Sequence, residues 1–114
     1  MKNIIAALFG LALCGSAHGT TSDDLNAFCQ AFDGTDDMES LGAAMCFGFT
    51  VGVADALENC FCFPDESTYE QYTFAVKEYL SDHPELHHLD GITLVRDAFE
   101  EAYPCSVESA QLTP

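Results

Sequence analysis

The chain has 114 residues, and nineteen acidic side chains against three basic ones give it a net charge of −16 at pH 7. Nucleic acids and anionic membrane surfaces are excluded as partners, because both would be repelled by so acidic a protein. A basic protein partner is favoured instead, and long-range attraction would speed its association. An acid-rich surface that serves solubility alone is the alternative explanation of the same charge.

Residues 1–19 have the pattern of a secretory signal peptide. Lys2 precedes an apolar run at 4–13, and small residues suited to cleavage follow it. The run is too short to span a membrane. Cleavage is expected after Ala17 or after Gly19, which predicts an exported, periplasmic protein.

The mature part, residues 20–114, is predicted to be one domain in an oxidising compartment. A chain this short buries only about 60–65% of its unfolded surface, so cross-links would add stability that the core lacks. Five cysteines remain in it: Cys29, Cys46, Cys60, Cys62 and Cys105. An odd number predicts two disulfides and one remaining thiol that is buried, reactive or paired between chains.

The first predicted helix runs from about Asp23 to Phe32, with Thr21 or Ser22 as its cap. Residues 33–37 then break the helix, because a glycine lies within an acidic run that suits the start of the next helix.

The central element of the predicted fold is a long helix over residues 38–59. Apolar residues recur in it at three- and four-residue spacing, and small residues occupy most of the other faces. Such a helix should have neighbours on several sides, and Gly48 and Gly52 would let another backbone approach closely. The helix leads into a cysteine-rich corner that ends at Pro64, where helical geometry must stop.

A third helix is predicted from about Thr68 to Leu80, and Ser67 with Glu70 fits a capping box at its start. Pro84 would then lie in the first turn of a fourth helix, which Gly91 could loosen in its middle. Residues 106–114 lack periodicity and are expected to be a frayed tail. The predicted fold class is therefore all-α, a small disulfide-stapled bundle of about four helices around the central one.

No catalytic motif accompanies these helices. The sequence lacks Gly-x-Ser-x-Gly, a glycine-rich phosphate loop and His-Glu-x-x-His, so we expect neither enzymatic activity nor a cofactor. A nucleophilic pair of Cys60 and a histidine is disfavoured, because cysteines in an oxidising compartment are usually paired or structural.

Metal ligation is the other chemistry that the residue types permit. Cys60 and Cys62 are too close for the usual zinc spacing, and a bridge between them would be strained. His83 and His87 would share one face of a helix, with His88 alongside, and such a face could hold a metal. A solvated surface explains the same three histidines.

Four segments, in a fixed order, carry a resemblance to a known family. They are Cys46-x-x-Phe49-x-x-Gly52-x-x-Asp55, Phe61-Cys62-Phe63-Pro64, residues 76–85 with Tyr79-Leu80-x-x-His83-Pro84-Glu85, and residues 94–105. In order and spacing, the chain resembles the Rap/Tai family of small exported immunity proteins from Cys29 to Cys105. It departs from the family pattern at Phe49, Phe63 and Phe99, which are core-type exchanges that leave the expected fold unchanged.

The resemblance implies a helical, disulfide-bonded periplasmic domain, often a homodimer. Such a protein binds and inhibits a toxin delivered by type VI secretion, commonly an amidase that cleaves peptidoglycan. The toxin itself is not identified by the resemblance, because fold alone does not fix function.

Two disulfides are compatible with this family, Cys29 with Cys46 and Cys62 with Cys105. They would close loops of about 17 and 43 residues and contribute about 3 and 4 kcal/mol on a chain-entropy argument. Cys60 would remain, either as a buried thiol that packs like a small apolar residue or as a bridge across a dimer.

Two loops, 33–37 and 81–88, are candidates for contact with the toxin. The second is favoured, because it combines carboxylates and imidazoles with Pro84, which lowers the ordering cost of binding. Its candidate contact residues are Ser81, Asp82, His83, Glu85, His87 and His88. The alternative is that the His-Pro-Glu segment serves only to start a helix.

Two further functions remain open at this point. A periplasmic acid-stress chaperone would use its many carboxylates as a switch that is neutralised below about pH 4. A metal-binding protein would use the three histidines near Pro84.

Overall fold

The computed structural model describes residues 19–34 and 40–105, and the helices in these ranges confirm the all-α fold. The elements are α2 (Ser22–Gln30), α3 (Leu41–Ala56), α4 (Tyr69–Asp82), the 3₁₀ turn η1 (Pro84–Leu86) and α5 (Gly91–Ala102). An isolated antiparallel bridge joins Thr21 to Asp90. The predicted signal peptide up to residue 18 and the predicted tail at 106–114 lie outside the described residues.

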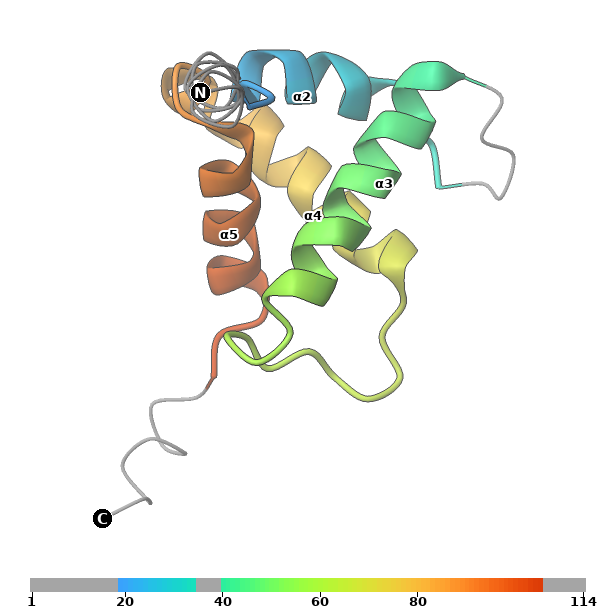
Figure 1. The fold of residues 1–114 in the computed structure, drawn as a ribbon, viewed down its shortest axis with the longest axis vertical. Helices are drawn as coiled ribbons and strands as arrows, with labels where there is room; N and C mark the ends of the chain where they lie inside the picture. The colour runs from blue at the N-terminus through green and yellow to red at the C-terminus, as the bar shows by residue number, and fades with distance from the viewer. Residues whose placement is uncertain (1–18, 35–39, 106–114) are drawn as a thin grey trace, which may run out of the picture.

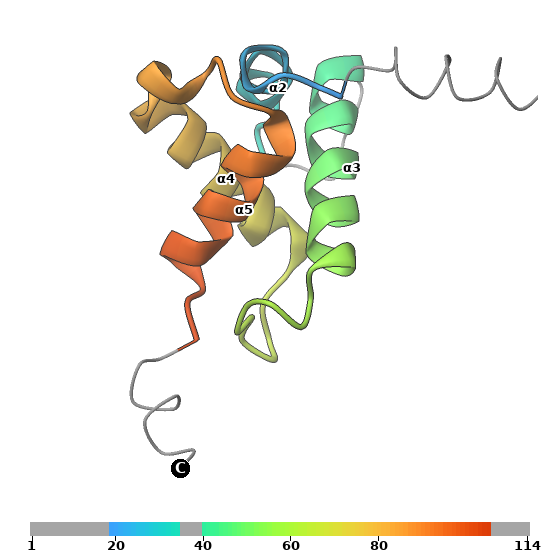
Figure 2. The ribbon, with the colours of Figure 1, turned by 60° about the vertical axis from the view of Figure 1, so that its left-hand side comes forward.

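The four α-helices form a bundle in which α2 crosses one end of the others (Figure 1). Helix α4 packs against α2, α3 and α5, and a second view shows it running behind α5 and α3 (Figure 2). Helix α3 packs mainly on α2 and α4. Both helices therefore contribute to the centre of the bundle, and α3 keeps one side free of these neighbours.

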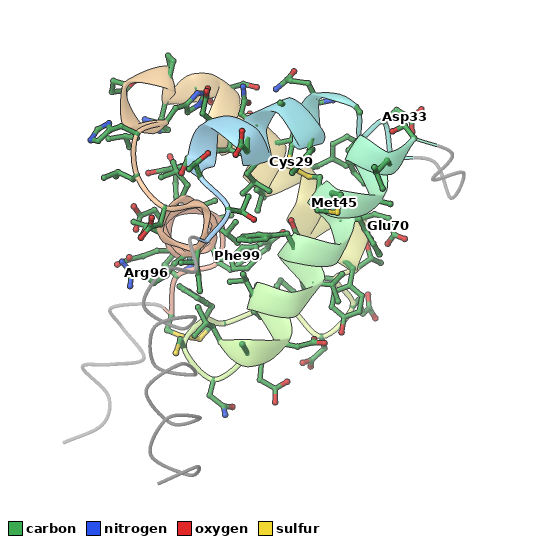
Figure 3. All side chains as sticks on the ribbon, turned by 45° about the horizontal axis from the view of Figure 1, so that its top comes forward. Cys29, Asp33, Met45, Glu70, Arg96 and Phe99 are labelled. Carbon is green, nitrogen blue, oxygen red and sulfur yellow. A yellow bond between two sulfur atoms is a disulfide. The ribbon has the colours of Figure 1, made fainter. Side chains whose placement is uncertain are left out.

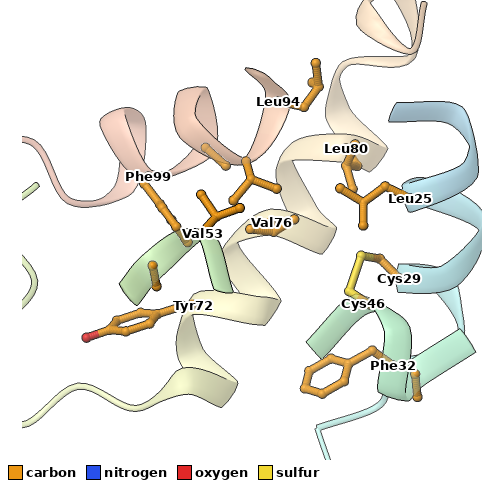
Figure 4. Packing of buried hydrophobic residues seen from close by; sticks show 14 residues of the cluster. Leu25, Cys29, Phe32, Cys46, Val53, Tyr72, Val76, Leu80, Leu94 and Phe99 are labelled. Atoms are coloured by element: carbon orange, nitrogen blue, oxygen red, sulfur yellow. A yellow bond between two sulfur atoms is a disulfide. The ribbon is translucent and has the colours of Figure 1, made fainter. Parts of the chain in front are cut away.

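The core is built from the inward faces of all four helices. Figure 4 shows the disulfide between Cys29 and Cys46 inside this core, close to Leu25 and Leu80. The buried apolar residues are Leu25, Cys29, Phe32, Ala43, Cys46, Val53, Ala54, Tyr72, Val76, Leu80, Leu94, Val95, Ala98 and Phe99. Burial of this apolar surface is the main force that holds the helices together.

Residues 19–34 and 40–105 contain two disulfides, and they are the pairs expected from the resemblance. Cys29 is bonded to Cys46, 17 residues away, and Cys62 is bonded to Cys105, 43 residues away. The first bridge is fully buried between α2 and α3, whereas both cysteines of the second are exposed. One cross-link therefore stabilises the core and the other ties the corner after α3 to the end of α5.

Helix α3 is shorter than the predicted helix over residues 38–59. It begins at Leu41 because the Ser40 hydroxyl accepts a hydrogen bond from the Ala43 N–H at 2.9 Å, and it ends at Ala56. The expected close backbone contact at Gly48 and Gly52 is wrong. A methyl group added to Gly48 or Gly52 would meet no atom within 4 Å, because α2 and α4 pack on other faces of α3.

Helix α4 starts with a capping box one residue later than predicted. The Thr68 hydroxyl accepts from the Gln71 N–H at 3.3 Å, and the Gln71 side chain accepts from the Thr68 N–H at 3.0 Å. The predicted box of Ser67 and Glu70 is wrong, because the Ser67 hydroxyl bonds to the Tyr72 hydroxyl instead.

The predicted fourth helix is divided in two. Pro84 begins only the short η1, and Gly91 is the first residue of α5 rather than a weak point in its middle. The Gly91 N–H donates to the Thr20 carbonyl at 2.8 Å, and a Cβ at Gly91 would lie 2.8 Å from that oxygen. The backbone before α2 therefore approaches too closely for any residue other than glycine.

Candidate functional site

The segment at 81–88 links α4 to α5 and lies at an outer corner of the molecule beside α2 (Figure 2). Its backbone is held by local hydrogen bonds, among them Leu86 N–H to the His83 carbonyl at 3.0 Å. The end of the connection is joined to α2, since the Ser22 N–H donates to the Leu89 carbonyl at 3.0 Å and the Ser22 hydroxyl to the Asp90 carbonyl at 3.0 Å. The connection therefore has a fixed shape before any partner binds.

His83 and Glu85 form a solvent-facing pair in this segment. The His83 Nδ1 lies 3.1 Å from a Glu85 carboxylate oxygen, and the His83 ring lies on the Tyr79 ring with centroids 4.2 Å apart. A hydrogen bond from the Glu85 backbone, followed by that from His83, lowers the pKa of Glu85. The pair presents an imidazole and a carboxylate in a defined orientation.

His87 and His88 are turned toward the protein's own backbone. The His87 Nε2 lies 2.7 Å from the Leu80 carbonyl, and its Nδ1 lies 3.8 Å from the Asp23 carboxylate. The His88 Nδ1 lies 3.1 Å from the Glu85 carbonyl. His87 is half-buried and stabilises the segment, whereas His88 is exposed and adds to its surface.

The expected helical face of three histidines is wrong. His83 is the residue that ends α4, and His87 follows η1, so the two do not belong to one helix. Among residues 19–34 and 40–105, no three His, Cys, Asp or Glu side chains are grouped closely enough to hold a metal ion. No observation in these ranges favours the metal-binding alternative.

Ser81 and Asp82 close the C-terminal end of α4. The Ser81 hydroxyl accepts from the Gln30 side chain at 3.1 Å, which gives a second tie to α2. Asp82 is exposed and lines a shallow groove of about 240 Å³ between α4 and α5, together with Glu78, Tyr79 and Glu101. Burial, and then the charges of Asp97 and Glu101, raise the pKa of Tyr79. The groove extends the acidic surface next to the segment 81–88.

The loop at 33–37 and the thiol of Cys60 are the remaining predicted features. Of the loop at 33–37, only Asp33 and Gly34 are described, and Gly34 has a positive φ of 84° that favours glycine. Cys60 is a free and exposed thiol, so its interpretation as a buried apolar residue is wrong. It lies in the turn after α3, where the chain has left the helix and faces solvent.

Sequence reasoning missed two hollows on the surface. One, of about 620 Å³, lies between the end of α3 and the start of α4 and is lined by aromatic and acidic side chains. The alternation of Phe61 and Phe63 around Cys62, followed by Tyr69 and Tyr72, was the available signal. The second, of about 480 Å³, lies beside Gly48 and Gly52 and extends to Ile92.

Within the described part of the chain, no helix is both long enough and apolar enough to cross a membrane. The family model of the Rap1a immunity proteins matches residues 21–105, about three quarters of the sequence. No curated protein shows detectable sequence similarity to the chain. The matched region begins just before α2 and ends at the last bridged cysteine.

Proposed function

Because the chain belongs to the Rap1a family of immunity proteins, we propose that it binds a toxin delivered by type VI secretion and blocks the toxin's active site. The toxin is a peptidoglycan-cleaving amidase, and the protein acts as a stoichiometric inhibitor without catalysis of its own. Residues 1–19 direct export, so that inhibitor and toxin meet in the periplasm, where both disulfides are stable.

The observation that carries this proposal is the fixed shape of the segment at 81–88. Ser81 and His87 bond it to Gln30 of α2 and to the Leu80 carbonyl of α4, and Ser22 of α2 holds Leu89 and Asp90, which follow it directly. An inhibitory loop loses affinity when it must be ordered on binding, and this cost is lowered here. The exposed pair of His83 and Glu85 can then enter a catalytic groove with little rearrangement.

The charge of the protein supports the same function. Nineteen acidic residues steer a basic partner toward the inhibitor, and the acidic groove beside Asp82 continues this field next to the loop. Fast association matters for an immunity protein, because each delivered toxin molecule must be captured before it cuts the cell wall.

Self-association is a second element of the proposal. Helix α3 exposes Leu41 and Met45 beside the bare glycines Gly48 and Gly52, which is a surface on which a second copy could pack. We propose a homodimer through this face. Sedimentation of the purified protein would show a dimer that Met45→Glu converts to a monomer, and an unchanged sedimentation rate would reject the interface.

The direct test uses the chain exported with its own leader and a purified peptidoglycan amidase, chosen from the secreted hydrolases encoded near its gene if there are any. Calorimetry at pH 7 should show a saturable complex, and the complex should protect peptidoglycan from digestion. His83→Ala with Glu85→Ala should weaken binding about tenfold or more. Glu66→Ala, an exposed carboxylate in the loop before α4, is the matched control.

Full binding by the double variant at 83 and 85 would remove the loop from the interface. Failure of the wild-type protein to bind or to protect peptidoglycan at neutral pH would reject the inhibitor itself. Capture of unfolded proteins only in acid would favour a chaperone instead.

A further inference from the structure

One of the hollows on the described surface has walls of aromatic side chains. It has a volume of about 620 Å³ and lies where the end of α3, the corner at 61–63 and the start of α4 meet. Its aromatic residues are Phe61, Phe63, Tyr69 and Tyr72. Their rings contact one another in a chain, with centroids 6.0 Å apart for Phe61 and Phe63 and 4.4 Å for Phe63 and Tyr72. Rings packed in this way hold the shape of the cavity without closing it.

Three carboxylates, Asp55, Glu58 and Glu70, also line the cavity. Asp55 accepts a hydrogen bond from the Tyr69 hydroxyl at 2.8 Å, which fixes the carboxylate beside the ring. That hydrogen bond and the negative charge of Asp55 raise the pKa of Tyr69, so the hydroxyl stays protonated as a donor. The cavity therefore combines ring faces with negative charge.

The basic side chains of the described residues lie elsewhere. The Lys77 ammonium donates to the Phe32 carbonyl at 2.7 Å, and Arg96 lies on α5, at the opposite side of the view from Glu70 (Figure 3). None of the three cavity carboxylates forms an ion pair with a cation of the described residues. The charge at the cavity is thus not neutralised by such a cation.

A cation in this cavity would be attracted both by the faces of the aromatic rings and by the carboxylates. Ring faces attract it through their quadrupole, and the attraction grows when water is excluded. A guanidinium suits this site best, because its plane can stack on a ring while its N–H groups reach a carboxylate. The hollow is also deep enough for a long side chain together with part of its backbone.

We propose that this cavity receives an arginine side chain of the bound toxin. The inference rests on the proposed function for the identity of the partner, but the chemistry of the cavity can be tested separately. The site lies at the N-terminal end of α4, whereas the segment 81–88 lies at its C-terminal end. Two contacts at opposite ends of one helix would fix the orientation of the toxin as well as its affinity.

The first experiment measures the cavity alone. The exported protein is titrated with the peptide N-acetyl-Gly-Arg-Gly-amide, and the backbone amide signals of Ala54, Thr68, Tyr69 and Tyr72 are followed by NMR. We expect saturable shifts at these residues and at least about fivefold weaker binding of the same peptide with uncharged citrulline in place of arginine. Equal binding of the two peptides would overturn the proposal.

Variants locate the binding. Glu58→Gln together with Asp55→Asn should weaken arginine-peptide binding about fivefold or more, since two of the three negative charges that line the cavity are removed. Glu58→Gln alone tests an exposed residue whose change should leave the fold intact, as verified by circular dichroism. The matched control is Asp24→Asn with Glu100→Gln, which removes equal charge at exposed positions of α2 and α5 that line neither the cavity nor the groove between α4 and α5. An equal loss in this control would show non-specific attraction and overturn the proposal.

A final arm separates this inference from the proposed function. If the cognate amidase binds the wild-type protein and binds the variant at 55 and 58 equally well, the cavity is not part of the interface, and the inference fails alone. If the arginine peptide binds as expected but the amidase does not, the proposed function fails while the chemistry of the cavity stands. A loss of amidase affinity of about fivefold or more in this variant, absent in the control, supports both.

Discussion

The two ends of α4 are stabilised in different ways. At its C-terminal end, the chain from Tyr79 to Gly91 is joined to α2 and the residues before it by directional hydrogen bonds. At its N-terminal end, the corner at 60–68 is held by packed rings, one backbone bond from Cys62 to Tyr103 and an exposed bridge. The hydrogen bonds at the C-terminal end fix the backbone of the segment in one position. The packed rings at the N-terminal end fix the spacing between the segments and leave a cavity beside them. The C-terminal end is therefore suited to enter a groove of the toxin, and the N-terminal end is suited to bind a side chain of the toxin.

The largest effect should come from removing the buried bridge. Replacing Cys29 and Cys46 by alanine loses about 3 kcal/mol of chain-entropy stabilisation and also the contacts of two fully buried sulfurs, for a total of about 5 kcal/mol. Urea unfolding of the exported protein would measure the loss.

The matched variant replaces the exposed pair Cys62 and Cys105 by alanine. This variant should lose about 4 kcal/mol of unfolding free energy. The chain-entropy term is larger than for the buried pair, because the loop is longer, but no buried contacts are lost in addition. A larger loss from this exposed pair than from the buried pair would contradict the contrast between the two ends.

The next largest loss of stability should come from the close contact between Gly91 and the Thr20 carbonyl at the start of α5. Gly91→Ala would press a methyl group against the Thr20 carbonyl, and we expect a loss of about 2–3 kcal/mol in unfolding free energy. Gly48→Ala, where the added group meets no atom within 4 Å, is the control and should be neutral or stabilising by up to about 1 kcal/mol. Equal losses at both positions would show that the approach of Thr20 is not what requires glycine.

The cap at the N-terminal end of α4 should contribute less to the unfolding free energy than the features above. Thr68→Ala removes the hydroxyl that accepts from the Gln71 N–H and should cost about 1 kcal/mol, whereas Thr68→Ser keeps the acceptor and should cost little. The measurement is the midpoint of thermal unfolding. If Ser67→Ala lowers the unfolding midpoint and Thr68→Ala does not, Ser67 rather than Thr68 is the cap of α4.

The smallest effect concerns the acid sensitivity of Glu85. Its folded-state pKa is lowered, so its carboxylate stabilises the fold above the ordinary glutamate pKa, and this contribution is lost as pH falls through the folded value. Glu85→Gln should therefore be slightly less stable than wild type near neutral pH, and the difference should shrink as pH falls through the folded-state pKa of Glu85. A difference that persists unchanged in acid would assign the effect to packing rather than charge.

Much of this architecture could be predicted from the sequence. Helical periodicity gave the four helices, and the family pattern gave the pairs Cys29–Cys46 and Cys62–Cys105. Errors occurred where a tertiary contact overrides a local signal. Gly91 has the local pattern of a weak mid-helix residue, but its contact with Thr20 makes it the start of α5.

The candidate site was less predictable than the fold for the same reason. Spacing placed His83 and His87 on one face, but Pro84 and η1 change the direction of the chain between them. Ser67 lost its expected role as a cap because Tyr72 offered another partner. The aromatic cavity depends on how two segments meet, which no single periodicity encodes.

The exposed thiol of Cys60 has a consequence for oxidative folding of the newly exported chain. Cys60 and Cys62 compete for Cys105, and loop closure favours neither, since the two loops differ by only about 0.04 kcal/mol in closure entropy. The choice therefore depends on contacts formed before oxidation, chiefly the bond from Cys62 N–H to the Tyr103 carbonyl at 3.1 Å and the Phe63 ring on Phe99. We therefore expect the bridge from Cys62 to Cys105 to form after the aromatic cluster has packed, and a chain oxidised earlier to contain some Cys60–Cys105 bridge instead.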